Sequence, residues 1–261
     1  MRFKLTLTRT SKQRMLPMEY MYYISAWIYK VIGKADKEFA QFLHDQGYGA
    51  SDTKLYKLFC FSPLNFGKPK IWKEKKLFEI KNHEISLQLA FDVQEAASHF
   101  IQGLFLEQEF YLGDKFNGID FKVTKVEALP EPKFTETMHY RLKTPWVVSY
   151  KVEGSNVAKY LKPGDDHFHE QSVRHIAEKY KNIRGEEIPA NEIDFKPGED
   201  YKRAGYVIKP NTPEQTRVVG NLFDFELTAP VKIHRMIWNA GVSEKSSIGF
   251  GWCEKKEIDG K

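Results

Sequence analysis

A glycine-flanked polar segment near the end of the chain, residues 241–252, has the composition of an anion-binding loop. It reads Gly241-Val242-Ser243-Glu244-Lys245-Ser246-Ser247-Ile248-Gly249-Phe250-Gly251-Trp252. Backbone without Cβ atoms can approach a phosphate closely, and free N–H groups beside Lys245 favour negative charge. The segment points to a polyanionic partner. The same glycines also suit a tight helix-to-strand turn, with positive φ at the helix end and a bulge in the strand.

Two other kinds of chemistry are disfavoured by the motifs. The chain has no G-x-x-x-x-G-K-[ST] phosphate loop, and its glycine segment lies at the wrong end for a dinucleotide fingerprint. His167, His169 and His175 are close in sequence, but no cysteine or carboxylate array completes a metal-ligand spacing. We therefore assign no metal and no cofactor.

A second basic segment precedes residue 77. It surrounds Trp72 with five lysines, Lys68, Lys70, Lys73, Lys75 and Lys76. Cations beside an aromatic ring suit phosphate contacts combined with stacking on a base. A solvated charge run is an equally good interpretation.

The composition is that of a folded protein in a reducing compartment. The 261 residues suit one large domain or two small ones, and 41% hydrophobic content is enough for ordinary cores. The formal net charge of +5 is compatible with nucleic acid but not diagnostic of it. Cys60 and Cys253 are the only cysteines, so a disulfide framework or zinc cluster is excluded. We expect a cytoplasmic protein.

The first half predicts the order β-α-β-β-α-β. Residues 1–9 alternate with period two, which indicates a half-buried strand and not a signal peptide. Helices are expected over 19–32, ending at Gly33, and over 36–47. Strands are expected over 54–61, 77–80 and 85–91, and the strands 77–80 and 85–91 should form a hairpin. A helix over 93–106 and a strand over 116–128 complete the first half.

The second half repeats this theme. Its expected elements are strands over 146–152, 201–209, 217–228 and 248–254, with helices over 168–180 and 231–240. The Pro-rich run 128–132 suits a hinge. The prediction is an α+β chain of two tandem ferredoxin-like units, residues 1–128 with the catalytic residues and 129–261 with the glycine-rich loop.

With two such units and this loop, the chain resembles the CRISPR repeat-processing endoribonucleases, the sixth CRISPR-associated protein family of the repeat-associated mysterious protein superfamily. The motifs that carry the resemblance are Met1-Arg2-Phe3, Ala26-Trp27-Ile28-Tyr29-Lys30, Phe42-Leu43-His44-Asp45, Lys54-Leu55-Tyr56 and residues 244–251. One departure is that Ser243 stands where the family's loop commonly has a second glycine.

The resemblance implies metal-independent cleavage of CRISPR repeat precursor RNA within its repeats, which yields mature guide RNA. A ribose 2′-hydroxyl attacks the adjacent phosphorus and leaves a 2′,3′-cyclic phosphate and a 5′-hydroxyl. Such a reaction needs a base, an acid and positive charge around the phosphorane. The family pattern assigns acid or base to His44, positioning of the 2′-oxygen to Tyr29 and charge stabilisation to Lys54. Each residue also has a purely structural interpretation. His44 would be a charge at a helix end, Tyr29 a core aromatic residue and Lys54 a solvated residue at a strand end.

RNA binding is expected from both basic segments. The predicted contacts are Gly241, Lys245, Ser246, Ser247, Gly249 and Gly251 of the loop, with Lys70, Trp72 and Lys73. Further phosphate candidates, ranked lower, are Arg2, Arg9, Lys202, Arg203, Lys232 and Arg235.

Other classes remain open beside the endoribonuclease. The same fold suits a non-catalytic RNA-binding subunit of a CRISPR effector complex, which would not need His44. A two-domain regulator of a small-molecule pathway would call for an acidic ligand pocket or cofactor motif, and the sequence shows neither. The expected partners are CRISPR repeat RNA, effector-complex subunits and a second copy in a homodimer, with no membrane.

Overall fold

Alternation at the start of the chain builds the central strand of a five-stranded antiparallel sheet. Leu5 and Leu7 of β1 (Arg2–Arg9) are fully buried, while Thr6 between them is partly exposed. The sheet order is β3-β6-β1-β8-β7. The other strands are β3 (Phe59–Phe61), β6 (Glu84–Phe91), β7 (Glu109–Gly113) and β8 (Gly118–Leu129). The computed structural model describes residues 1–49, 55–151, 154 and 158–257.

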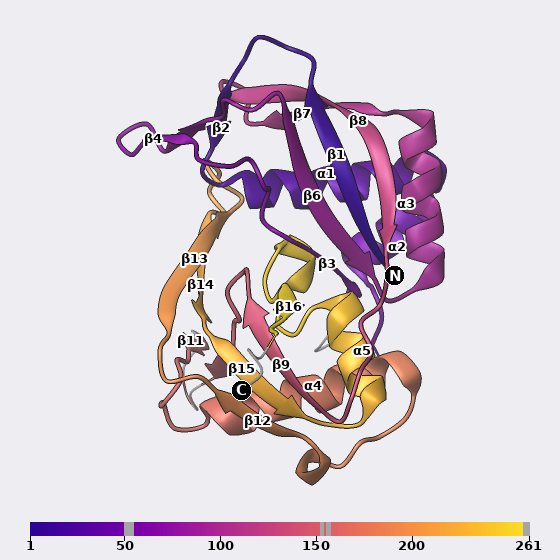
Figure 1. Cartoon of the computed structure of the whole chain (residues 1–261), viewed down its shortest axis with the longest axis vertical. Coiled ribbons are helices and arrows are strands. Elements are labelled where there is room, and N and C mark those ends of the chain that lie inside the picture. The colour runs from indigo at the N-terminus through magenta and orange to yellow at the C-terminus, as the bar shows by residue number, and fades with distance from the viewer. Residues whose placement is uncertain (50–54, 152–153, 155–157, 258–261) are drawn as a thin grey trace.

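Two helices pack against each other beside this sheet (Figure 1). They are α1 (Tyr20–Ala35) and α3 (Gln94–Leu106). Their close approach requires Gly103, because a Cβ there would lie 1.9 Å from the Val31 carbonyl oxygen. The predicted end of the first helix at Gly33 is wrong, since the helix runs to Ala35. A single glycine is tolerated within a helix whose apolar face is buried.

The second predicted helix is confirmed with its cap. The Asp36 side chain accepts a hydrogen bond from the Phe39 N–H at 2.9 Å and begins α2 (Lys37–Asp45). Gly47 follows the helix with a φ of 67°. Asp36 thus ends α1 and starts α2.

The second half has a four-stranded antiparallel sheet with the order β12-β15-β9-β16. Its elements are β9 (Thr137–Leu142), α4 (Phe168–Arg184), β12 (Asp194–Pro197), β15 (Asp224–Thr228), α5 (Val231–Ala240) and β16 (Cys253–Lys255). In the first sheet β6, the third strand of the β-α-β-β-α-β series, lies beside β1, the first. In the second sheet β15 lies beside β9 in the same way, so that two β-α-β crossovers interlock in each half. The α+β fold with antiparallel sheets is confirmed. β8 runs to Leu129, and the division of the chain at residues 128 and 129 stays a prediction.

Several predicted strands belong to small sheets outside these two. The smaller elements are β2 (Met15–Pro17), β4 (Lys70–Trp72), β5 (Leu77–Glu79), β10 (Ser149–Lys151), β11 (Ala158–Tyr160), β13 (Lys202–Ile208), β14 (Thr216–Leu222) and the short helices η1 (Ala190–Glu192) and η2 (Ser246–Ile248). The predicted hairpin of 77–80 with 85–91 is wrong, because β5 pairs with β2 and β4 whereas β6 pairs with β1 and β3. Period-two patterning identifies a strand but not its partner.

The strands of the second half needed most correction. β9 and β12 were not predicted, and the strand expected over 146–152 is only β10, which pairs with β11. The stretch 217–228 is two strands in different sheets, since β14 pairs with β13 and β15 pairs with β9 and β12. The last strand, expected over 248–254, begins only at Cys253.

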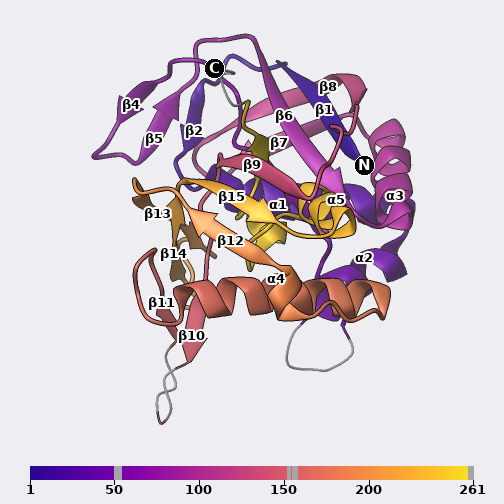
Figure 2. The ribbon, with the colours of Figure 1, turned by 60° about the horizontal axis from the view of Figure 1, so that its bottom comes forward.

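The two halves meet along β1, β3 and the segment from α5 to β16 (Figure 1). Arg2 of β1 donates hydrogen bonds to the carbonyl oxygens of Trp238 and Cys253, and it lies between the rings of Trp238 and Trp252. Figure 2 shows α4 on the outer side of the second half, with the β10–β11 ribbon near its N-terminal end. No helix among the described residues is long and apolar enough to cross a membrane.

Candidate nucleic-acid interface and active site

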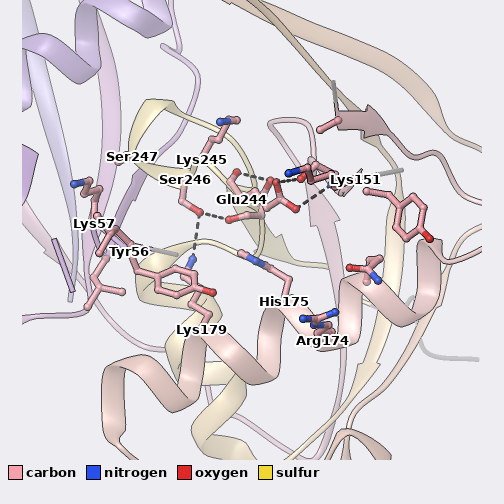
Figure 3. Close-up of a pocket in the computed structure, with 17 residues that line it drawn as sticks. Tyr56, Lys57, Lys151, Arg174, His175, Lys179, Glu244, Lys245, Ser246 and Ser247 are labelled. Carbon is pink, nitrogen blue, oxygen red and sulfur yellow. Dashed lines mark hydrogen bonds between the residues drawn. The ribbon is translucent and has the colours of Figure 1, made fainter. Parts of the chain in front are cut away.

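A cavity of about 520 Å³ opens where the two halves meet (Figure 3). Its walls come from residues 55–58 of the first half and from β10, α4 and residues 243–247 of the second. Five cationic side chains line it, Lys57, Lys151, Arg174, Lys179 and Lys245. Among the described lining residues Glu244 is the only acid. The balance of charge therefore favours an anionic ligand.

Packing, rather than access to phosphate, explains the three glycines of the loop. Gly241, Gly249 and Gly251 are buried and have φ angles of 75°, 91° and 73°. A Cβ at Gly249 would lie 2.3 Å from Met21 Cε, and one at Gly251 would lie 2.4 Å from the Ser243 backbone nitrogen. Direct contact of these glycines with RNA stays a prediction.

Two side chains fix the loop to the second half. The Ser243 hydroxyl accepts a hydrogen bond from the Val147 N–H at 2.7 Å. The Glu244 carboxylate accepts from the N–H and the hydroxyl of Ser149 at 2.9 and 2.7 Å. Ser243 is fully enclosed, so the serine at this position is an anchor for the loop. Its role was missed because a serine in a polar run gives no sign of its burial.

The loop presents Lys245 and Ser247 to the cavity. Lys245 is exposed and has a φ of 56°, a strained value for a residue with a side chain. Both residues line the cavity, and the Lys245 ammonium group brings positive charge to this end of the loop. An ammonium group beside a serine hydroxyl is suited to binding a phosphate. Ser246, the third polar residue predicted to bind RNA, is buried and donates to the Ser243 carbonyl oxygen at 2.6 Å.

A buried lysine lies beneath this loop. Lys179 of α4 is 3% exposed, and its ammonium group donates to the carbonyl oxygens of Ala240 and Gly241 at 2.8 and 2.7 Å. It also donates to the Ser246 hydroxyl at 3.3 Å. These bonds satisfy carbonyls at the C-terminal end of α5, where a cation is favoured. Burial lowers the pKa of Lys179 to about 8, so the group remains mainly charged at pH 7.

The lowered pKa predicts a pH-dependent stability. The unfolded chain holds this proton up to its ordinary pKa of 10.5, whereas the folded protein releases it near 8. Between these values the unfolded state binds more protons, so the contribution of Lys179 to the free energy of unfolding increases with pH. We expect the difference between the parent protein and Lys179→Met to widen by about 3 kcal/mol from pH 7 to pH 10.5. Urea unfolding at several pH values measures it, and a constant difference would contradict the assignment.

Tyr29 and His44 come together beside the loop. Their rings are 5.2 Å apart in an edge-to-face arrangement. Burial raises the pKa of Tyr29 to about 12, opposed by a side-chain hydrogen bond with Ser247. Tyr29 therefore keeps its proton at neutral pH and acts as a hydrogen-bond donor rather than as a base. The side chain of His44 is 68% exposed and available to a ligand.

Asp45 orients the His44 ring. The two side chains meet at 2.7 Å between His44 Nδ1 and Asp45 Oδ1. An ionised carboxylate only accepts hydrogen bonds, so Nδ1 is the donor and Nε2 is left for proton exchange. The hydrogen bond from His44 lowers the pKa of Asp45, which keeps the carboxylate ionised.

A lysine that was not predicted completes this cluster. The Lys57 ammonium group donates to the His44 carbonyl oxygen at 2.6 Å and also lines the cavity. Burial lowers the pKa of Lys57, opposed by the Asp45 carboxylate. Lys54, the predicted catalytic lysine, lies outside the described residues. Lys57 was missed because it lies three residues beyond the position that the family pattern suggests.

Comparisons with known proteins identify the family of this chain. The family model of CRISPR-associated protein Cas6, N-terminal, matches residues 15–127, and that of CRISPR associated protein Cas6, C-terminal, matches residues 129–255. The chain belongs to the Cas6 family. Among curated Cas6 proteins, the CRISPR-associated endoribonuclease Cas6 1 of Methanocaldococcus jannaschii is 24% identical to this chain. The match covers 96% of this chain and 91% of that protein.

Solved Cas6 structures share the fold. The product of a Cas6-related gene from Pyrococcus furiosus has a TM-score of 0.82 at 21% identity and covers 98% of both chains. A RAMP protein described as binding different RNA substrates also has a TM-score of 0.82, at 20% identity, and covers 98% of this chain and 100% of its own. The Cas6 resemblance drawn from the sequence is confirmed.

The basic segment around Trp72 forms part of a separate small sheet of this Cas6-family chain. Lys70 and Lys73 are exposed, and the Lys70 ammonium lies 4.0 Å from the centre of the Trp72 ring. The Trp72 indole N–H donates to Glu79 at 3.1 Å. A base that stacks on this ring must displace the lysine from that face or use the other face. Binding of RNA by Lys70, Trp72 and Lys73 stays a prediction.

Three of the six lower-ranked phosphate candidates are engaged within the protein. Arg2 is 3% exposed and bonded within the core, so its expected contact with phosphate is wrong. Lys232 pairs with Glu186 and Arg235 pairs with Glu131. The three clustered histidines considered as a metal site also have separate surroundings. His167 stacks on Tyr150, His169 lies near Asp194 and His175 lines the cavity.

Proposed function

We propose that this chain is an endoribonuclease that cleaves CRISPR repeat RNA, with the scissile phosphate held between His44 and residues 245–247. The observation that supports this most is the position of α1, whose Tyr29 ring contacts the His44 ring and whose Ser25 hydroxyl donates to the Ser247 carbonyl oxygen at 2.7 Å. It joins a group that exchanges protons from the first half to an anion-binding loop from the second. The relative in M. jannaschii carries the name of such an endoribonuclease.

The reaction is an internal transesterification. The 2′-oxygen loses its proton and bonds to the adjacent phosphorus, the bond from phosphorus to the 5′-oxygen breaks, and the 5′-oxygen takes up a proton. The products are a 2′,3′-cyclic phosphate and a 5′-hydroxyl. His44 exchanges one of these two protons through Nε2.

Other residues position the substrate and stabilise its charge. Tyr29 donates a hydrogen bond to the 2′-oxygen. Lys57 and Lys245 stabilise the negative charge on the phosphorane from two sides of the site. Lys54 has the same role in the family pattern. Association with effector-complex subunits, a homodimer and a cytoplasmic location stay predictions.

The test compares two repeat RNAs in the presence of EDTA. One is all ribose, and the other carries a single 2′-deoxy sugar at the cleaved position. We expect cleavage of the ribose RNA alone, with a cyclic phosphate on the upstream product. Cleavage of the deoxy RNA at that position would contradict attack by the 2′-hydroxyl. Tight binding without cleavage of either RNA would identify a non-catalytic RNA-binding subunit instead.

A further inference from the structure

The cavity continues beyond the phosphate site to an aromatic inner wall. Tyr56 and His175 are each 8% exposed and line it from opposite halves of the chain. Their rings are 5.9 Å apart and tilted by 48°. The volume of about 520 Å³ lies within the range of small-molecule sites, roughly 300 to 1,000 Å³. The whole cavity is larger, and this wall more aromatic, than a phosphate alone requires.

The hydroxyl of Tyr56 is a buried donor that needs an acceptor. Within the part of the chain that the structure describes, it has no hydrogen-bond partner. Figure 3 shows it directed toward the interior of the cavity, between α4 and the loop. Burial raises the pKa of Tyr56, so the hydroxyl keeps its proton. A buried hydroxyl without a partner is costly, and a ligand with an acceptor atom would remove this cost.

One face of α4 adds further polar groups. Gln171 and His175 are four residues apart on this helix and both line the cavity. The Gln171 amide offers a donor and an acceptor, the pair of groups that reads the edge of a base. The Glu244 carboxylate keeps its negative charge, but it is held by two hydrogen bonds from Ser149 and is outnumbered by the cations that line the cavity.

We propose that this cavity binds the base of one unpaired nucleotide adjacent to the cleaved phosphate. The base packs against Tyr56 and His175, accepts a hydrogen bond from the Tyr56 hydroxyl and meets the Gln171 amide. This inference rests on the proposed function. It adds a site of sequence recognition, because an unstacked base read on its edge is how proteins usually recognise RNA sequence.

The position of the nucleotide follows from shared residues. Lys57, Lys245 and Ser247 line the cavity and also surround the proposed phosphate site. A nucleotide whose phosphate contacts these groups places its base within the same cavity. The base is therefore that of a nucleotide next to the cleaved bond and not of a distant part of the repeat.

The test is a scan of abasic sites through repeat RNA made uncleavable by one 2′-deoxy sugar. We expect one position next to the cleavage site where loss of the base weakens binding by the parent protein about tenfold. Tyr56→Phe and Gln171→Ala should each weaken binding of intact RNA about fivefold to tenfold. In both variants the penalty of the abasic site at that one position should shrink, while penalties elsewhere stay as in the parent. Tyr201→Phe, on an exposed tyrosine outside the cavity, is the matched control and should change neither quantity.

Abasic penalties that are the same in the parent and in both variants would overturn the inference, as would a scan without a sensitive position beside the cleavage site. Either result is distinct from failure of the proposed function. If the proposed function failed, all-ribose repeat RNA would stay uncleaved by the parent protein. Circular dichroism and thermal unfolding of each variant show whether it is folded, and Tyr56→Phe retains the buried ring.

Discussion

Replacing His44 by alanine should slow cleavage of repeat RNA by about 10²- to 10⁴-fold, the usual contribution of one general acid or base. Affinity for uncleavable RNA should change little, because the His44 side chain is 68% exposed and holds no element of the fold in place. Single-turnover cleavage with saturating protein measures the first quantity, and filter binding measures the second. His83→Ala, on an exposed histidine in a turn, is the matched control.

A substrate with sulfur in place of the 5′-oxygen separates the two roles of His44. A thiolate leaves without protonation, so this RNA restores cleavage by His44→Ala if His44 is the acid and leaves it slow if His44 is the base. Asp45→Asn should lower the cleavage rate less than His44→Ala does and should alter the pH profile of cleavage. The neutral asparagine amide is a weaker acceptor for the Nδ1 proton of His44 than the carboxylate. Full cleavage of the normal RNA by His44→Ala would remove His44 from the reaction.

Replacing Arg2 by alanine should lower the free energy of unfolding by about 3 to 5 kcal/mol. The change leaves the buried carbonyl oxygens of Trp238 and Cys253 without donors and removes the cation between Trp238 and Trp252. Arg2 joins β1 to α5 and β16, so both halves should lose stability together. Urea unfolding followed by tryptophan fluorescence measures the effect.

The matched control for Arg2 is Arg9→Ala on the same strand. Arg9 is partly exposed and makes one long hydrogen bond, at 3.3 Å, to the Ile80 carbonyl oxygen. Its loss should cost roughly 0.5 kcal/mol or less. The loss of unfolding free energy in Arg2→Lys should lie between those of Arg2→Ala and Arg9→Ala. Lysine keeps the charge but lacks the planar guanidinium group that reaches both carbonyls. Equal effects of Arg2→Ala and Arg9→Ala would contradict the role of Arg2 as a link between the halves.

Locally determined elements of the fold were predictable from sequence. The helix that begins at Asp36 follows from a side chain that caps its own first turn, and the strand over 2–9 follows from alternation. β9 had the same signal, since Met138, Tyr140 and Leu142 alternate and are buried, but it was missed. Strand partners were harder, because residues 77–79 and 84–91 carry similar patterns and pair in different sheets.

The sequence by itself determined the fold class, the glycine-rich loop and the histidine in the last turn of a short helix, since each depends on residues close together in the chain. Only the tertiary structure decided which of these groups meet. It brought Ser247 to Tyr29, placed Lys57 at His44 and enclosed Arg2 in the core. The physical reason is that the sequence states which side chains carry a charge or a hydroxyl, whereas their burial and partners depend on how separate segments pack. For Arg2 these segments are more than 200 residues apart in the chain.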